Sequence, residues 1–364
     1  MGEVLYRKYR PIGFDEVIGQ EHIVQTLKNA ITHGAVAHAY LFVGPRGTGK
    51  TTLARILAKA VNCPHAIKHK GEPCNECQNC EDISSGRALD IIEIDAASNR
   101  GIDEIRELRE GARLSPTQMK YKVYIIDEAH QLTKEAFNAL LKTLEEPPAH
   151  VIFILATTSA DKMPPTILSR VQRFDFKKFS VAQIETKLTA ILAKEKVKAE
   201  ANAVRMIAHA AEGGLRDAES MLSQVLSHTS KELTAEVVQS VLGVANNKQV
   251  ADFIDLVAKG DLKEMLVYIN TFYNEGGSAE EFLKSLAQYT RKITLLKIDA
   301  GMRESVVPEL TDEQFSAMVA QAKRFELADL RRMCEVLIEA QDNTKKTPLP
   351  LLPLELALMK IFEK

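Results

Sequence analysis

The sequence is poor in cysteine, has almost no net charge and lacks long apolar runs. Five cysteines among 364 residues are too few for a disulfide scaffold. The 47 lysines and arginines nearly balance the 49 aspartates and glutamates, which argues against a polybasic nucleic-acid coat but leaves room for a local basic surface. No apolar run approaches the roughly 18 residues of a membrane span, and the start of the chain lacks the basic-then-apolar pattern of a signal peptide. We therefore expect a cytoplasmic protein without membrane contact.

The order of apolar segments indicates a layered α/β domain in the first half of the chain. Apolar residues make up 45% and charged residues 26%, as in an ordinary globular protein, and the length suits two or three domains. Short apolar runs bounded by Gly, Asp or Thr alternate with helical patterns such as 51–61 and 134–145. Such runs are typical of strands buried on both faces of a parallel sheet. The predicted strands are Tyr40–Val43, Asp90–Ile94, Val123–Ile126, Val151–Ala156 and Arg173–Phe176.

Beyond Ser180 the pattern becomes helical. Apolar residues recur at helical spacing over 181–194, 201–211, 216–227 and 234–242, and Gly213-Gly214 and Asn246-Asn247 interrupt the pattern. We predict an α/β domain over residues 1–179, a helical domain over 180–243 and a second helical domain over 244–364.

A complete phosphate-binding loop follows the first predicted strand. Residues 44–51 match G-x-x-x-x-G-K-[ST] and lie between a strand and a helix, the context that the motif requires. Glycines let backbone N–H groups surround phosphates, and the helix N-terminus adds partial positive charge. We expect Lys50 at the β- and γ-phosphates of ATP and the Thr51 hydroxyl on Mg²⁺. The predicted nucleotide-binding residues here are Gly44, Pro45, Arg46, Gly47, Thr48, Gly49, Lys50, Thr51 and Thr52.

Two acids end the third predicted strand. Asp127 and Glu128 follow an apolar run, and a carboxylate at this edge lies beside the phosphate loop in such a sheet. Asp127 is the expected carboxylate on the Mg²⁺ side, and Glu128 is placed to polarise an attacking water. Alone, the pair would read as a solvated strand end. Asp-Glu-Ala-His also matches a helicase signature, but the helical remainder offers no second nucleotide-binding domain.

Four of the five cysteines form a cluster in the sequence. Cys63, Cys74, Cys77 and Cys80 read C-x₁₀-C-x₂-C-x₂-C, a spacing that suits a closed, structural zinc site. The polar segment around them cannot build a core alone, so a metal would supply folding energy. The alternatives are an iron–sulfur cluster and, less favoured, a set of unliganded thiols.

Further short motifs accompany these sites. They are Gln20-Glu21-His22, residues 138–148 with their Glu-Glu-Pro-Pro end, Leu155-Ala156-Thr157-Thr158 and Ile167-Leu168-Ser169-Arg170. The whole set resembles the gamma/tau family of AAA+ ATPase subunits in the bacterial DNA polymerase III clamp loader, most specifically over residues 1–243. The resemblance implies an AAA+ P-loop domain with an inserted zinc module at about 63–80, an all-α lid and an all-α collar.

The resemblance also implies roles for single residues. Thr158 matches the polar sensor near the γ-phosphate, with Thr157 as the alternative if the register differs by one. Arg216 matches the lid arginine that contacts the chain's own nucleotide, and Arg170 matches the arginine finger that reaches a neighbour's ATP. The usual Ser-Arg-Cys triplet is here Ser-Arg-Val over 169–171. Val17 and Ile18 are expected to line the adenine pocket, near the basic strip 6–11.

By this resemblance the chain is an ATP hydrolase that opens the sliding clamp (beta) and loads it onto primer–template DNA. Its expected partners are the clamp, the delta and delta-prime subunits, other copies of itself and the DNA, with residues 244–364 as the collar. Two other hypotheses stay open. One is a branch-migration helicase motor, although no winged domain is evident. The other is a nucleotide-binding scaffold without useful hydrolysis, against which an intact Lys50, Asp127 and Glu128 argue.

Overall fold

The computed structural model describes residues 4–99, 101–229, 232–242, 247–307, 310, 312–344 and 346–362. The chain divides into two compact units, one of residues 1–197 and 207–223, the other of residues 198–206 and 224–364. The predicted boundary at residue 243 and Asn246 lie outside the described residues. The three domain ranges therefore remain a prediction.

A five-stranded parallel sheet forms the centre of the first unit, with the strand order β2-β3-β4-β1-β5. All five strands that the sequence predicted are present, which confirms the α/β fold class. Val43 at the end of β1 pairs with Thr157 in β4, and Ile126 in β3 pairs with Leu155. The carboxyl ends of the three central strands therefore reach the same edge of the sheet. The strands are β1 (Ala39–Val43), β2 (Ile91–Asp95), β3 (Lys122–Asp127), β4 (Val151–Thr157) and β5 (Gln172–Asp175).

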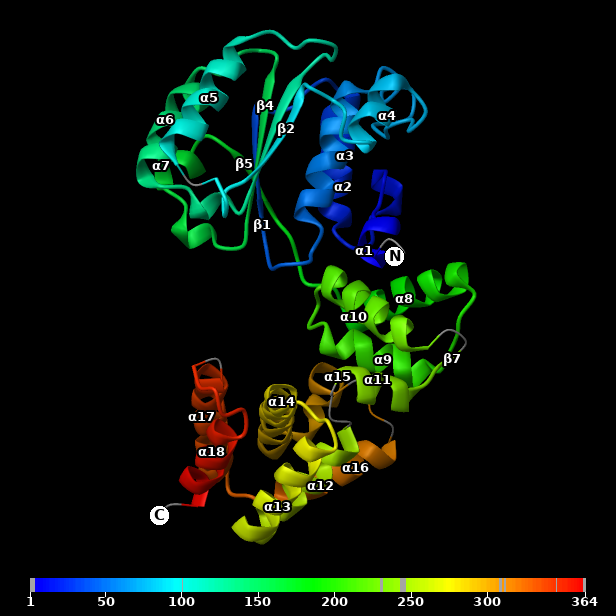
Figure 1. The fold of residues 1–364 in the computed structure, drawn as a ribbon, viewed down its shortest axis with the longest axis vertical. Coiled ribbons are helices and arrows are strands. Elements are labelled where there is room, and N and C mark those ends of the chain that lie inside the picture. The colour runs from blue at the N-terminus through cyan, green and yellow to red at the C-terminus, as the bar shows by residue number, and fades with distance from the viewer. Residues whose placement is uncertain are drawn as a thin grey trace. The chain divides into compact units, whose positions relative to one another are not determined.

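Helices cover both faces of the sheet because successive strand residues point to opposite sides. Tyr40 and Phe42 of β1 belong to the core formed with α2 (Glu21–Thr32) and α3 (Lys50–Asn62). Leu41 belongs to the other core, which includes residues of the helices on the opposite face. These are α5 (Ile102–Arg113), α6 (Lys134–Glu145) and α7 (Pro165–Leu168), seen across the sheet from α2 and α3 in Figure 1.

Short elements and further helices make up the rest of the chain as far as Leu242. α8 begins at a capping box in which Ser180 and Gln183 exchange hydrogen bonds, in agreement with the predicted start of the helical segment. The sequence predicted only helices beyond this point, but Lys198–Ala199 (β6) and Glu232–Leu233 (β7) form a two-residue parallel pair. The other elements are α1 (Leu5–Lys8), η1 (Phe14–Glu16), α4 (Gln78–Ser84), η2 (Ala129–Gln131), η3 (Ala160–Lys162), α8 (Val181–Glu195), α9 (Ala201–Ala210), α10 (Leu215–His228) and α11 (Ala235–Leu242).

Helices that pack on one another form the core of the second unit. Phe253, Phe282, Leu286 and Leu337 are buried at its centre. Among the described residues, none of its helices, nor any in the first unit, combines the length and apolarity that a membrane crossing needs. Its elements beyond residue 246 are α12 (Asn247–Lys259), α13 (Leu262–Asn274), α14 (Ala279–Ile298), η4 (Ala300–Met302), α15 (Arg303–Val306), α16 (Asp312–Lys323), α17 (Leu327–Thr344) and α18 (Leu352–Phe362).

A buried carboxylate anchors the connection that leads into β3. Asp90 is 1% exposed and accepts hydrogen bonds from the backbone N–H groups of Thr117, Gln118 and Met119 at 2.8, 2.8 and 3.0 Å. Burial alone would raise the pKa of Asp90, but the three donors outweigh it and hold the pKa below its ordinary value. Folding therefore favours the ionised form of this side chain.

We predict that Asp90→Asn destabilises the sheet by about 3 kcal/mol, because an amide cannot accept all three bonds and leaves a buried donor unpaired. The measurement is hydrogen exchange of the β3 amides, with the exposed Asp161→Asn as the matched control. The stabilisation is present above the unfolded pKa of about 4 and is lost as the pH falls through the lower folded pKa. The difference in stability between wild type and Asp90→Asn should therefore become smaller below about pH 4. An equal effect of both substitutions would contradict the prediction.

Candidate functional site

The phosphate loop connects β1 to α3, as the sequence predicted. Gly47 has a φ of +75°, and a Cβ atom there would lie 3.1 Å from the Cα atom of Gly214. Both the backbone conformation and the available space therefore require glycine. α3 begins at Lys50, so the positive end of its dipole lies at the loop.

The side chain of Lys50 folds back over this loop. Its Nζ donates to the carbonyl oxygens of Gly44 and Pro45, each at 2.8 Å, and the residue is 6% exposed. Burial lowers the pKa of Lys50, while the negative charges of Glu128 and Asp127 oppose that shift. The ammonium group thus occupies a position where phosphate oxygens could exchange with the two carbonyls.

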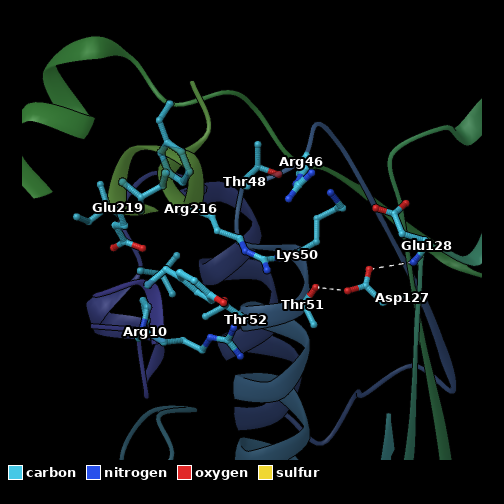
Figure 2. A pocket seen from close by; sticks show the side chains of 18 of the residues that line it. Arg10, Arg46, Thr48, Lys50, Thr51, Thr52, Asp127, Glu128, Arg216 and Glu219 are labelled. Carbon is cyan, nitrogen blue, oxygen red and sulfur yellow. Dashed lines mark hydrogen bonds between the residues drawn. The ribbon is translucent and has the colours of Figure 1, made fainter. Parts of the chain in front are cut away.

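Asp127 joins the end of β3 to the start of α3. The Thr51 hydroxyl donates to Asp127 Oδ2 at 2.6 Å, and Asp127 Oδ1 accepts from the backbone N–H of Glu128 at 2.9 Å (Figure 2). Hydroxyl and carboxylate oxygens are ligands that Mg²⁺ prefers. The structure therefore brings together the two residues that the sequence assigned to magnesium.

Glu128 is held in an uncommon backbone conformation. Its φ of +47° lies in the left-handed region, which is strained for a non-glycine residue, and strained residues of this kind cluster at active sites. The Thr158 hydroxyl donates to Glu128 Oε2 at 3.1 Å, and His130 Nδ1 lies 3.4 Å from the same oxygen. The two contacts fix the carboxylate at the edge of the sheet.

The sequence left two candidates for the polar sensor, Thr157 and Thr158, and these two residues have different surroundings in the structure. Thr157 is fully buried, accepts from the Ser159 N–H at 3.0 Å and lies 2.8 Å from His130 Nδ1. Thr158 is exposed and contacts Glu128 directly. The sequence shows His130 only as the last residue of Asp-Glu-Ala-His, and its position between Glu128 and Thr157 becomes evident only in the structure.

A cavity of about 380 Å³ collects most of the predicted nucleotide-binding residues. Gly44 and Pro45 are not in its lining but hold Lys50, and Thr158 and Arg170 are also not in the lining. Sequence reasoning missed Asp95, Ala97, Phe179, Leu215 and Glu219. The predicted residues that line it are Val17, Ile18, Arg46, Gly47, Thr48, Gly49, Lys50, Thr51, Thr52, Asp127, Glu128 and Arg216.

The first turn of α10 closes this cavity. The Leu215 N–H donates to the carbonyl oxygen of Gly47 at 3.1 Å, so the helix start is tied to the phosphate loop. The guanidinium carbon of Arg216 lies 4.8 Å from the centre of the Tyr6 ring. Hydrogen bonding from Arg216, and then from Arg7, lowers the pKa of the Tyr6 hydroxyl. Figure 2 shows the Arg216 side chain extending toward Lys50.

Arg170 lies elsewhere, just beyond α7. Its guanidinium donates to the carbonyl oxygen of Thr166 at 2.8 Å, to Ser169 Oγ at 2.9 Å and to Glu145 Oε1 at 2.8 Å. The side chain is 34% exposed. Arg170 is not one of the residues that line the cavity.

The four clustered cysteines meet in space. Their sulfur atoms all lie within 4.8 Å of one another, and those of Cys74 and Cys80 are 4.0 Å apart. A tetrahedral zinc site with Zn–S bonds of about 2.3 Å places its sulfurs about 3.8 Å apart. The donor set and its spacing therefore suit zinc.

Thiol acidity differs within the cluster. Burial would raise the pKa of Cys74, but backbone N–H groups of Glu76 and Cys77 outweigh it and lower the pKa to about 7. Burial raises the pKa of Cys80 and of Cys63. A bound cation would reverse this burial effect, since it stabilises all four thiolates.

Models of known families match consecutive parts of the chain. The model described as "DNA polymerase III, delta subunit" matches residues 19–180. "DNA polymerase III clamp loader subunit, ATPase lid domain" matches residues 183–231, and "DNA polymerase III subunits gamma and tau domain III" matches residues 233–364.

Curated relatives agree with these models. The chain is 41% identical to DNA polymerase III subunit tau of Bacillus subtilis over 99% of its own length and 63% of the relative. It is 40% identical to DNA polymerase III subunit tau of Escherichia coli, over 81% of this chain and 46% of the relative. The chain thus spans about half to two thirds of these tau subunits.

A solved structure and a shorter relative complete the comparison. The RuvB branch migration motor of Thermotoga maritima covers 72% of this chain and 85% of its own, with 20% identity and a TM-score of 0.49, too low to support an argument. DNA polymerase III subunit gamma of Buchnera aphidicola subsp. Acyrthosiphon pisum is 35% identical over 99% of this chain and 98% of its own. The chain therefore belongs to the DNA polymerase III gamma/tau clamp-loader subunit family.

Proposed function

We propose that this chain is the ATP-driven motor subunit of a clamp loader, which opens the beta sliding clamp and places it on primer–template DNA in the bacterial cytoplasm. The observation that carries the proposal is the cavity in which Lys50, Thr51, Asp127, Glu128 and Arg216 converge. This set offers a cation for phosphate, oxygen ligands for a metal and a carboxylate for water.

ATP binding would use the phosphate loop and two cationic side chains, Lys50 and Arg216. Backbone N–H groups of the loop would surround the phosphates, and Lys50 and Arg216 would neutralise their charge. Thr51 and Asp127 would hold Mg²⁺, which offsets charge on the phosphoryl oxygens. Val17 and Ile18 would contact the adenine.

Hydrolysis would depend on Glu128 and its contacts. The carboxylate would accept a proton from, or polarise, the attacking water. Thr158 donates to this carboxylate at 3.1 Å, so the threonine would set its orientation and respond to the γ-phosphate.

The assembled loader would supply Arg170 from one chain to the nucleotide of the next. This interpretation is supported by the absence of Arg170 from the lining of its own chain's cavity and by the partial exposure of its side chain. Residues 244–364 would form a collar that joins copies of this chain to delta and delta-prime subunits. Clamp and DNA binding would then stimulate hydrolysis and release the clamp.

The decisive experiment measures ATP turnover by the loader with and without clamp, delta, delta-prime and primed DNA. We expect strong joint stimulation by the clamp and the DNA. Stimulation by four-way junctions would instead indicate a branch-migration motor, and an unchanged rate would indicate a scaffold.

We predict that Glu128→Gln binds ATP normally but hydrolyses it about 100-fold more slowly, because an amide cannot act as a base. The measurement is turnover in the reconstituted loader alongside ATP affinity. The control is Glu135→Gln, the same change at an exposed site on α6, which should leave both unchanged. Turnover of Glu128→Gln within twofold of wild type would assign water activation to another group.

Arg170→Ala should keep ATP affinity but lose assembly-stimulated hydrolysis by about 10³-fold, the lower range for arginine fingers. The test mixes Arg170→Ala chains with Lys50→Ala chains in one loader. A site with an intact Lys50 and an intact neighbouring Arg170 should recover part of the activity that neither variant has alone. If Arg170→Ala alone keeps full assembly-stimulated turnover, Arg170 is only a charged residue at the end of a helix and does not act on a neighbour's nucleotide.

We propose that the cysteine cluster holds about one structural zinc ion per chain. Cys77→Ser should release the zinc and loosen residues 63–80 while ATP binding stays measurable, because the metal site is separate from the cavity. Elemental analysis and hydrogen exchange measure the two effects. Cys334→Ser, outside the cluster, should keep the zinc. Iron in place of zinc, or no metal, would contradict the proposal.

A further inference from the structure

Glu219 is a buried charge that the proposed chemistry does not use. It lies one turn after Arg216 on α10, lines the same cavity and is 6% exposed. Among the described residues, no hydrogen bond or ion pair to its carboxyl group is present. A buried carboxyl group without a partner is unfavourable, and this one has access only to the cavity.

The position of Glu219 along the cavity identifies the part of a nucleotide that it would meet. Residues three apart share a helix face, so Arg216 and Glu219 both point into the cavity but at different depths. Figure 2 shows Arg216 directed toward Lys50, with Glu219 on the side away from Lys50 and Asp127. Since the phosphates belong at Lys50, Glu219 belongs near the base or the ribose.

The other residues of the cavity lining favour the base over the ribose as the group near Glu219. Pro11, Val17, Ile18 and Phe179 also line the cavity and supply apolar surface of the kind that flat bases contact. An acceptor set among apolar side chains contributes orientation and specificity rather than general affinity. The 6-amino group of adenine is a hydrogen-bond donor, whereas the 6-oxo group of guanine or hypoxanthine is an acceptor.

We propose that Glu219 accepts a hydrogen bond from the 6-amino group of adenine and so selects ATP over 6-oxopurine nucleotides. This inference rests on the proposed function of the cavity as an ATP site. A 6-oxopurine would instead place its 6-oxo oxygen against the Glu219 carboxylate. Both groups are hydrogen-bond acceptors and neither would have a donor, which is the kind of mismatch that gives strong discrimination between ligands.

The electrostatics are consistent with this role. Burial raises the pKa of Glu219 to about 7, while the charge of Lys187 opposes the shift. At pH 8 most of the carboxyl group is therefore ionised and acts as an acceptor only. We choose pH 8 for the test for this reason.

The experiment is calorimetric titration of the full chain with ATP, inosine triphosphate and 2′-deoxy-ATP. Wild type should bind ATP at least about tenfold more tightly than inosine triphosphate, as expected for one hydrogen bond to a charged group. Glu219→Leu should lose that ratio by weakening ATP binding. Glu219→Gln, nearly the same shape, should bring the ratio close to one because its amide also donates to a 6-oxo group. Glu107→Gln, an exposed site on α5, is the matched control and should keep the wild-type ratio.

The outcomes separate this inference from the function that it rests on. If wild type binds ATP but both Glu219 variants keep its ATP preference within twofold, the base contact is wrong and the ATP site stands. If the variants change only the preference of ATP over 2′-deoxy-ATP, Glu219 contacts the ribose, which also overturns the inference. If wild type binds no ATP, the proposed function fails together with it.

Discussion

The site depends on the parallel pairing of β3, β4 and β1. Because parallel strands in register end at one edge, the sequence segments after Val43, Ile126 and Ala156 meet there although more than a hundred residues separate the first from the last. The 2.6 Å hydrogen bond between Thr51 and Asp127 is the direct result. The anchoring of the segment before β3 by Asp90 fixes where that strand starts, and so where Asp127 ends it.

Sequence reasoning is most specific where chemistry requires a fixed local pattern. The phosphate loop, the paired acids and the four cysteines are short motifs whose backbone or ligand geometry allows few alternatives, and the strands carry continuous apolar runs. The parallel pair β6–β7 was not predicted because two residues cannot show a periodicity. His130 and Glu219 were missed for a different reason. A glutamate in an amphipathic helix looks like a solvated residue, and only the folded structure shows that Glu219 is 6% exposed.

The location of Arg170 bears on how ATP turnover would be controlled in the proposed loader. Among the described residues, the cationic side chains in the cavity lining are Arg10, Arg46, Lys50 and Arg216. Arg170 is instead held at the end of α7 by Thr166, Ser169 and Glu145. If it completes a neighbour's site, as we propose, turnover becomes conditional on assembly, and hydrolysis reports that the subunits are in place.

The cavity lining contains two buried ionisable side chains of opposite sign, Lys50 and Glu219. Burial shifts both toward their neutral forms, lowering the pKa of Lys50 and raising that of Glu219. A ligand that brings negative phosphate to Lys50 and a hydrogen-bond donor to Glu219 relieves both penalties at once, whereas free phosphate relieves only the first. The same burial that destabilises these groups in the protein alone therefore increases the difference in affinity between a complete adenine nucleotide and its fragments. The proposed selectivity would thus follow from the desolvation of two charged groups for which no salt bridge is present among the described residues.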